Sequence, residues 1–372
     1  MANFDLFYEI INNPGQYAMN WKKETGNMVI GYFCSYAPEE IITAAGALPY
    51  RILAGSGSIS KADAHLQAYS CSLVRGALED ALNGRLDFLE GTVFPNTCDS
   101  IQRLSDIWRM NAGFKFHADV MVPAKLNTQS ARDYMTAVLE KFKKELEEHT
   151  GIEITEEKLK EAIDMYNGIR KNLSRLYAIR RDAPGVIKSS DIHAIFKAAM
   201  VMDRRQLLEE LERLTADLGE KADAPDTAKK RIVLSGGLCS MPDIYKTIEN
   251  SGGAVVWDDF CTGSRYFEGD IKTDGDPLKS ISDRYMERVV CPAKHRGVLN
   301  RGEYLINAVK ENRADGVIFL LLKFCDPHAF DYPYMKEMLE KENISSVLFE
   351  IEDQLPSEGQ INTRCEAFME ML

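Results

Sequence analysis

The stretch MVIGYFCSYAPEEIITAAGALPYRIL, residues 28–53, sets the pattern of the fold. Residues 28–33 form a short apolar run typical of a strand, 39–47 favour a helix, and 49–53 are extended again. The alternation continues to residue 122, with helices expected over 70–82 and 99–108 and strands over 88–94 and 116–122. Strands separated by helices predict a parallel sheet that is covered on its faces.

From residue 130 the pattern changes to long amphipathic helices. Apolar side chains recur at helical steps of three, four and seven, as at Leu159, Ile163 and Tyr166. Thr155 is the expected N-cap of this helix, followed by two acidic residues in the first turn. A second helical block is expected over about 191–218, and the polar stretch 219–230 has the composition of a linker.

After the linker the alternation resumes. Strands are expected over 231–234, 254–257, 316–324 and 346–351, and helices over 244–249 and 304–311. The chain therefore predicts an α/β fold with two Rossmann/flavodoxin-like lobes that contain parallel sheets and resemble each other. The expected segments are an N-terminal lobe over 1–129, a helical segment with its linker over 130–228, and a C-terminal lobe over 229–372.

Charge and hydropathy exclude several classes of function. The chain of 372 residues has 45 Lys and Arg against 57 Asp and Glu, a net charge of −12, and no basic block that would bind nucleic acid. The longest aliphatic and aromatic run, residues 317–322, is too short to span a bilayer. No basic region followed by an apolar stretch occurs at the N-terminus, which predicts a cytoplasmic protein.

Eight cysteines are scattered along the chain, at positions 34, 71, 98, 239, 261, 291, 325 and 365. In a reducing compartment they are expected to be free thiols or metal ligands. No C-x-x-C pair occurs, so the compact spacings of zinc ribbons and bacterial ferredoxins are missing. Any metal site must therefore combine distant parts of the chain.

Three of these cysteines follow expected strands. Cys34, Cys98 and Cys325 stand where ligands collect in open parallel sheets, outside the carboxyl ends of the strands. Cys98 also precedes an expected helix, whose dipole favours the thiolate, and Cys71 lies near the start of another helix. Thiolates select iron–sulfur clusters or zinc. The alternative is that these cysteines are small buried apolar residues, and spacing alone does not separate the two interpretations.

Other candidate sites are weaker. Gly236-Gly237 lacks the third glycine of a dinucleotide-binding motif, so a tight turn is favoured over a phosphate site. Glu39 and Glu40 follow Pro38 and are interpreted first as acids at a helix N-terminus, and only second as acid–base groups.

Five stretches resemble, in order, motifs of the 2-hydroxyacyl-CoA dehydratase and benzoyl-CoA reductase family. They are GYFCSYAPEEII at 31–42, continuing to AAGALP at 44–49, then CSLVR at 71–75, PNTCDS at 95–100, DDFCTGSR at 258–265 and KFCDP at 323–327. The likeness extends over most of the chain. It is greatest to the shorter, beta subunit of such dehydratases.

The resemblance implies a cytoplasmic heterodimer of two similar α/β subunits, each of which holds a 4Fe-4S cluster between its lobes. An ATP-hydrolysing iron–sulfur activator supplies one electron to such proteins. In the dehydratases that electron reaches an (R)-2-hydroxyacyl-CoA, forms a ketyl radical anion, expels the hydroxyl group and leads to the 2-enoyl-CoA.

The same resemblance implies which residues hold the cluster. Cys71, Cys98 and Cys325 match its ligands, and Cys34 is either a fourth ligand or an adjacent thiol. Four thiolates would make this chain the electron-relay subunit, which agrees with its length. Ser35 and Glu39 would then line the cluster pocket or the subunit interface, and we take them as candidate catalytic residues.

Three other functions remain open: a reductase subunit, an electron-transfer protein and a binding protein without a cofactor. The chain could be a subunit of an ATP-dependent benzoyl-CoA-type reductase, which delivers net electrons to its acyl-CoA. It could be an electron-transfer protein without an acyl-CoA site, like the double-cubane relatives of the family, which require additional cluster cysteines. A cofactor-free α/β binding protein would contain no iron.

Overall fold

The described part of the chain folds around two parallel sheets. The computed structural model describes residues 3–55, 57–219, 230–237, 243–288, 290–297, 299–351 and 358–372. The first sheet has the order β2-β1-β3-β4, and its strands are β1 (Val29–Tyr32), β2 (Leu48–Arg51), β3 (Gly91–Pro95) and β4 (Phe116–Val120). The second has the order β6-β5-β7-β8, with β5 (Lys230–Gly236), β6 (Gly253–Asp259), β7 (Gly316–Leu322) and β8 (Ser345–Ile351). The predicted α/β class, with two lobes that each contain a parallel sheet, is confirmed.

Both sheets have the same strand order, as expected for two similar lobes. In each sheet the first strand lies between the second and the third, so the connection after the second strand must cross to the opposite side. The strand order thus reverses between β1 and β3 and again between β5 and β7, which are paired neighbours. Such a reversal opens a crevice at the carboxyl ends of the two strands.

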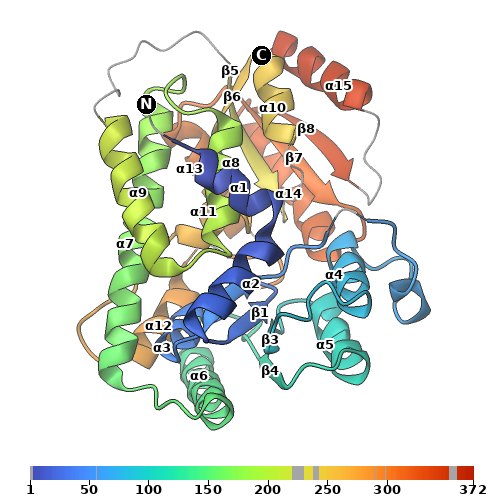
Figure 1. Ribbon diagram of the computed structural model, residues 1–372. Coiled ribbons are helices and arrows are strands. Elements are labelled where there is room, and N and C mark those ends of the chain that lie inside the picture. The colour runs from blue at the N-terminus through green and yellow to red at the C-terminus, as the bar shows by residue number, and fades with distance from the viewer. Residues whose placement is uncertain are drawn as a thin grey trace.

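The first sheet is buried on both faces. Successive side chains of its strands point to opposite sides, and each side packs in its own hydrophobic core. Val29 and Phe33 belong to one core and Ile30 and Tyr32 to the other. The helices of this lobe and of the N-terminus are α1 (Asp5–Asn12), α2 (Pro14–Thr25), α3 (Glu39–Ala44), the short η1 (Ala62–Ala64), α4 (Ser72–Leu82) and α5 (Asp99–Asn111). Most of them lie around the lower part of the molecule in Figure 1.

The helical segment consists of α6 (Gln129–Thr150), α7 (Glu156–Asp182), α8 (Ser189–Ala199) and α9 (Arg204–Gly219). Thr155 caps α7 as predicted, since its hydroxyl accepts a hydrogen bond from the backbone N–H of Lys158. The expected second helical block is divided into α8 and α9 by a turn at residues 200–203. Residues 220–229 of the expected linker lie outside the described part of the chain.

The C-terminal third contains α10 (Asp243–Asn250), α11 (Ser264–Phe267), α12 (Pro277–Glu287), α13 (Asn300–Glu311), α14 (Asp326–Lys341) and α15 (Glu358–Met371). Helix α12 packs into the core of the first lobe, where Ile281, Tyr285 and Met286 are buried with residues of β1 and β3. Hydrophobic packing therefore crosses the expected boundary between the lobes. The segment limits at 129 and 228 stay predictions.

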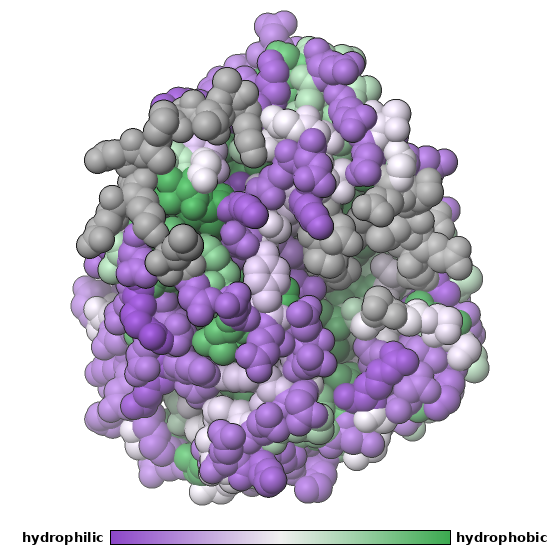
Figure 2. All heavy atoms as spheres, turned by 45° about the horizontal axis from the view of Figure 1, so that its top comes forward, coloured by the Kyte–Doolittle hydropathy of each residue, from purple (hydrophilic) through white to green (hydrophobic). Residues whose placement is uncertain are grey.

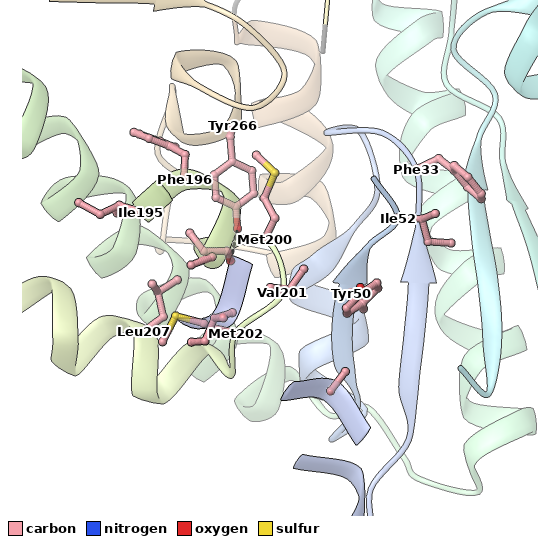
Figure 3. Close-up of a cluster of buried hydrophobic side chains, with 14 of the residues drawn as sticks. Phe33, Tyr50, Ile52, Ile195, Phe196, Met200, Val201, Met202, Leu207 and Tyr266 are labelled. Carbon is pink, nitrogen blue, oxygen red and sulfur yellow. Dashed lines mark hydrogen bonds between the residues drawn. The ribbon is translucent and has the colours of Figure 1, made fainter. Parts of the chain in front are cut away.

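A buried cluster connects the three segments (Figure 3). The turn after α8, with Met200, Val201 and Met202, lies beside Tyr50 of β2, and Tyr266 of α11 points toward Met200. Hydrogen bonds fix the arrangement, because the N–H of Arg51 donates to the carbonyl of Met200 at 3.0 Å. The Tyr266 hydroxyl donates to the carbonyl of Ala199 at 3.4 Å.

The face shown in Figure 2 is mostly hydrophilic, with hydrophobic residues in separate small areas. Within the residues that the structure describes, none of the helices combines the length and the apolar character needed to cross a bilayer.

Candidate functional site

Three of the predicted cysteines share one local geometry. Cys71, Cys98 and Cys325 are the N-cap residues of α4, α5 and α14. Cys98 follows β3 and Cys325 follows β7, so each lies beside the crevice of its own sheet. Backbone N–H groups in the first turn of each helix interact with the thiol and favour its ionised form. The fold thus presents three helix N-termini with a thiol at each.

These three thiols are electrostatic neighbours. Burial raises the pKa of Cys98, and the nearby Cys71 and Cys325 raise it further. The pKa of Cys325 is raised to about 12 by burial first and then by Cys71. Burial is also the main cause that raises the pKa of Cys71. Cys71, Cys98 and Cys325, which are far apart in the sequence, are therefore near enough to act on one another electrostatically, and their role as cluster ligands stays a prediction.

Three further cysteines lie in the same region. The pKa of Cys291 is raised to about 11 by burial and then by Cys261 and Cys34. Cys291 in turn raises the pKa of Cys98 and of Cys325. Cys34 is a candidate from the sequence, whereas Cys261 and Cys291 are not among the predicted ligands. The motif at 258–265 contains Cys261 and is the signal that points to it. Cys239 lies outside the described residues.

The thiols fit an iron–sulfur cluster by donor type. Among the described residues, no group of three or more His, Cys, Asp or Glu side chains is placed to hold a single metal ion. A single ion requires all its ligands around one point, at about 2.3 Å for zinc and sulfur. A cluster instead binds its thiolates at separate iron atoms, and Cys thiolate is its ordinary ligand. The buried thiols would lose their protons as a cationic group binds.

Cations accompany the thiols. Arg265 Nη1 donates to Cys261 Sγ at 3.6 Å, while its Nε donates to Asp259 at 2.6 Å. Asp259 is fully buried and also accepts from Arg301 Nη2 at 2.8 Å. These two guanidinium groups hold the pKa of Asp259 below its usual value against the effect of burial. Asp259 of the sequence motif therefore fixes the segment that contains Cys261 through its two arginine partners.

Ser35 is held by a buried arginine. Arg288, which follows α12, donates from Nη1 to the Ser35 carbonyl and from Nη2 to the Ser35 hydroxyl, both at 2.7 Å. Its guanidinium lies over the Tyr36 ring at 4.4 Å, and the Tyr285 hydroxyl donates to the Ala37 carbonyl at 2.6 Å. The loop that contains Cys34 is thus fixed by contacts from α12.

Glu39 lies within a closed network. Its Oε1 accepts from the Tyr32 hydroxyl at 2.8 Å, from Arg204 Nη2 at 2.6 Å and from the Tyr266 hydroxyl at 3.4 Å. The three donors come from β1, α9 and α11, so the carboxylate joins all three segments. This geometry gives Glu39 a positioning role, and a catalytic role for Ser35 or Glu39 stays a prediction.

Gly236, one of the two glycines considered for a phosphate site, is explained by backbone packing. A Cβ atom there would lie 2.0 Å from the carbonyl oxygen of Leu320, so only glycine lets β5 approach β7 this closely. Residues 238–242, which follow the glycine pair, lie outside the described part of the chain.

Comparison with known proteins gives the same family that the motifs indicate. Residues 34–372 match the family model described as 2-hydroxyglutaryl-CoA dehydratase, D-component. The chain is 30% identical to the (R)-phenyllactyl-CoA dehydratase beta subunit of Clostridium sporogenes, over 100% of both chains. It is also 30% identical to one of the subunits of benzoyl-CoA reductase from Thauera aromatica, covering 94% of this chain and 92% of that protein.

A third relative aligns over nearly the whole of both chains. Lactoyl-CoA dehydratase subunit beta of Anaerotignum propionicum is 30% identical, with 98% of this chain and 97% of the relative aligned. The similarity thus spans both lobes and the helical segment between them. The chain belongs to the 2-hydroxyglutaryl-CoA dehydratase D-component family.

Proposed function

We propose that this chain is the electron-relay subunit of an oxygen-sensitive radical dehydratase, which converts an (R)-2-hydroxyacyl-CoA to the 2-enoyl-CoA. The observation that carries the proposal is that Cys71, Cys98 and Cys325 each stand at a helix N-terminus, and that the thiols of Cys71 and Cys325 raise the pKa of Cys98. Similarity to dehydratase beta subunits over the full chain supports it independently.

The reaction needs an electron because the β-hydrogen of a 2-hydroxyacyl thioester is not acidic. One electron added to the thioester carbonyl gives a ketyl radical anion, which expels the hydroxyl group. Loss of the β-proton and return of the electron then give the enoyl thioester, so the electron is not consumed. A 4Fe-4S cluster, when bound, supplies this one-electron transfer.

The residues of the chain have the following roles in the proposal. Cys71, Cys98 and Cys325 would hold the cluster, with Cys34 as fourth ligand or adjacent thiol. Arg288 fixes the loop of Cys34 through its two hydrogen bonds to Ser35. Glu39 and Arg204 hold the first lobe against the helical segment. Cys34 and Cys71 are buried, and Cys98 and Cys325 are partly buried.

The proposed partners are a larger, homologous alpha subunit, an ATP-hydrolysing iron–sulfur activator and the acyl-CoA. Relatives that are named as subunits of dehydratases and of a reductase support an assembly of more than one chain. The proposal places the complex in the cytoplasm, the reducing compartment in which free thiols persist.

A second candidate is an electron-transfer protein that binds no acyl-CoA. The number of thiols in the region favours it, since Cys34, Cys261 and Cys291 adjoin the first three. Additional cluster cysteines are what a double cubane requires. A role in a benzoyl-CoA-type reductase is supported in turn by the 30% identity to a polypeptide of that enzyme.

Anaerobic purification with the partner chain separates these candidates. We expect about four iron and four sulfide per copy of this chain for one cubane, and about eight or more for the double form. With activator and acyl-CoA, dehydration leaves the redox level of the substrate unchanged, whereas ring reduction consumes reductant. Iron-free protein from a strictly anaerobic preparation would overturn the proposal.

A further inference from the structure

Lys294 is a buried cation in the loop that contains Cys291. Its side chain is only 7% exposed, and Nζ donates to the carbonyls of Val122 at 2.8 Å and of Asn96 at 3.4 Å. These carbonyls lie just beyond the ends of β4 and β3. Among the ion pairs of the described residues, none joins Lys294 to a carboxylate.

Backbone hydrogen bonds hold the loop in place. The N–H of Lys294 donates to the carbonyl of Cys291 at 2.9 Å, and the N–H of His295 donates to the carbonyl of Ala124 at 2.7 Å. The N–H of Leu126 in turn donates to the carbonyl of His295 at 2.9 Å. The ammonium group is therefore fixed at the edge of the first sheet, on the side from which Cys98 follows.

Three thiols act electrostatically on Lys294. Burial lowers the pKa of the Lys294 ammonium, whereas Cys291, Cys34 and Cys98 raise it. A buried ammonium that has only neutral carbonyl partners is costly, since each buried charge loses its hydration. Anionic sulfur ligands would remove this cost because they place negative charge beside the amine.

We propose that Lys294 is a positioning residue that supplies the counter-charge of the iron–sulfur cluster and so sets its reduction potential. The inference rests on the proposed function, because it requires a cluster held by the neighbouring thiols. A fixed positive charge in a low-dielectric region favours the reduced, more negative state of the cluster. Loss of that charge shifts the midpoint potential to more negative values.

The test compares three variants, purified anaerobically as the complex with the partner chain. Lys294→Gln removes the charge and keeps a hydrogen-bond donor, and Lys294→Arg keeps the charge. Lys125→Met is the matched control, since Lys125 is exposed in the loop that pairs with residue 295, and solvent screens its charge. Each protein is analysed for iron and sulfide, and its cluster is titrated with dithionite under EPR or visible absorption.

We expect full iron content and a more negative midpoint potential for Lys294→Gln, with near wild-type potentials for Lys294→Arg and Lys125→Met. Loss of iron in Lys294→Gln but not in Lys294→Arg would also support the role of the charge. An unchanged potential in iron-loaded Lys294→Gln would overturn the inference and leave the proposed function intact. Loss of iron in both Lys294 variants would also overturn it, because the lysine would then act only through its geometry. A wild-type complex without iron would instead contradict the proposed function itself.

Discussion

Cys71, Cys98 and Cys325 occupy positions where polar caps are ordinarily found. Ser, Thr, Asp or Asn at an N-cap accepts a hydrogen bond from the helix backbone, whereas the thiols of these three cysteines are weaker acceptors for the N–H groups of the first turn. Phe324, directly before Cys325, adopts a left-handed backbone with φ of 65°, which is unfavourable for a bulky residue. The backbone next to Cys325 is therefore strained, as is common at functional sites.

Single cysteine substitutions test the ligand assignment. Cys98→Ala or Cys325→Ala should abolish the brown absorption band of anaerobically prepared protein, because each removes a thiolate that the cluster needs. Cys365→Ala should retain the band, since Cys365 is buried in the core of the second lobe and no other thiol is among the groups that shift its pKa. Visible spectra and iron analysis give the result. Retention of the band in both Cys98→Ala and Cys325→Ala would refute the assignment.

Replacement of Glu39 tests its structural role. Glu39→Gln leaves the fully buried guanidinium of Arg204 without its carboxylate, so we expect the free energy of unfolding to fall by about 3 kcal/mol. The matched control is Glu156→Gln, which removes an exposed pair with Lys160 and should cost less than about 0.5 kcal/mol. Urea unfolding followed by circular dichroism measures both. Equal midpoints for the two variants would mean that the network around Glu39 contributes little.

At the level of elements, the strands of both sheets are predictable because short apolar runs alternate with amphipathic helices. Helix α14 is not predicted from the sequence, since it contains Pro333 and exposes Phe330 and Tyr334. Helix α12 is also missed, and no composition signal shows that it packs on the first lobe. The turn at residues 200–203 divides a continuous amphipathic block and contains neither Gly nor Pro.

Strand ends are one sequence signal for the candidate site, and the start of a helix, as at Cys71, is another. Cys34, Cys98 and Cys325 follow strands, so their places at the carboxyl ends of the two sheets can be expected from the geometry of parallel sheets. Cys291 and Lys294 lie in a loop without a preceding strand, and tertiary packing alone brings that loop to the edge of β3 and β4. Such long-range placement cannot be predicted from local pattern.

The start of α12 offers a test at the scale of one helix. Asp276 caps it by accepting a hydrogen bond from the Lys279 N–H at 2.7 Å. Asp276→Ala should lower the free energy of unfolding by about 1 kcal/mol, while Asp276→Asn, which keeps an acceptor, should change it by a few tenths. Thermal or urea unfolding distinguishes them. If Ala and Asn behaved alike, the cap would have no measurable effect on α12.

At the scale of the whole molecule, charged side chains meet where α11, α12 and α13 converge. Glu268, directly after α11, accepts a hydrogen bond from the Tyr304 hydroxyl at 2.7 Å. The charged groups that act on it are Asp259 from β6, Arg265 from α11 and Arg288 from the end of α12. Burial is the largest cause that raises the pKa of Glu268 to about 7, and Asp259 adds to it.

This raised pKa links stability to pH. Between the ordinary pKa of glutamate, roughly 4.3, and about 7, the native state holds a proton on Glu268 that the unfolded chain releases. The contribution of Glu268 is therefore fully present below the lower value and is lost as pH rises through about 7. Burial lowers the pKa of His193 and of His328. The unfolded chain therefore binds protons at these histidines below about pH 6.5 while the native state does not, so their contribution to stability falls as pH falls. The contribution of Glu268 to the pH dependence of stability is therefore measured as the difference between the wild type and a Glu268 variant.

Glu268→Gln should remove this pH dependence. Measured by urea unfolding from pH 5 to pH 7.5, the stability of the wild type should decline relative to Glu268→Gln by roughly 2–2.5 kcal/mol, because only the wild type releases the proton. Glu303→Gln is the control, since Glu303 is exposed on α13, the helix that provides Tyr304. Its curve should run parallel to the wild type. A Glu268→Gln curve that also ran parallel would show that the carboxyl is already ionised at pH 5, and that Arg265 and Arg288 compensate its burial.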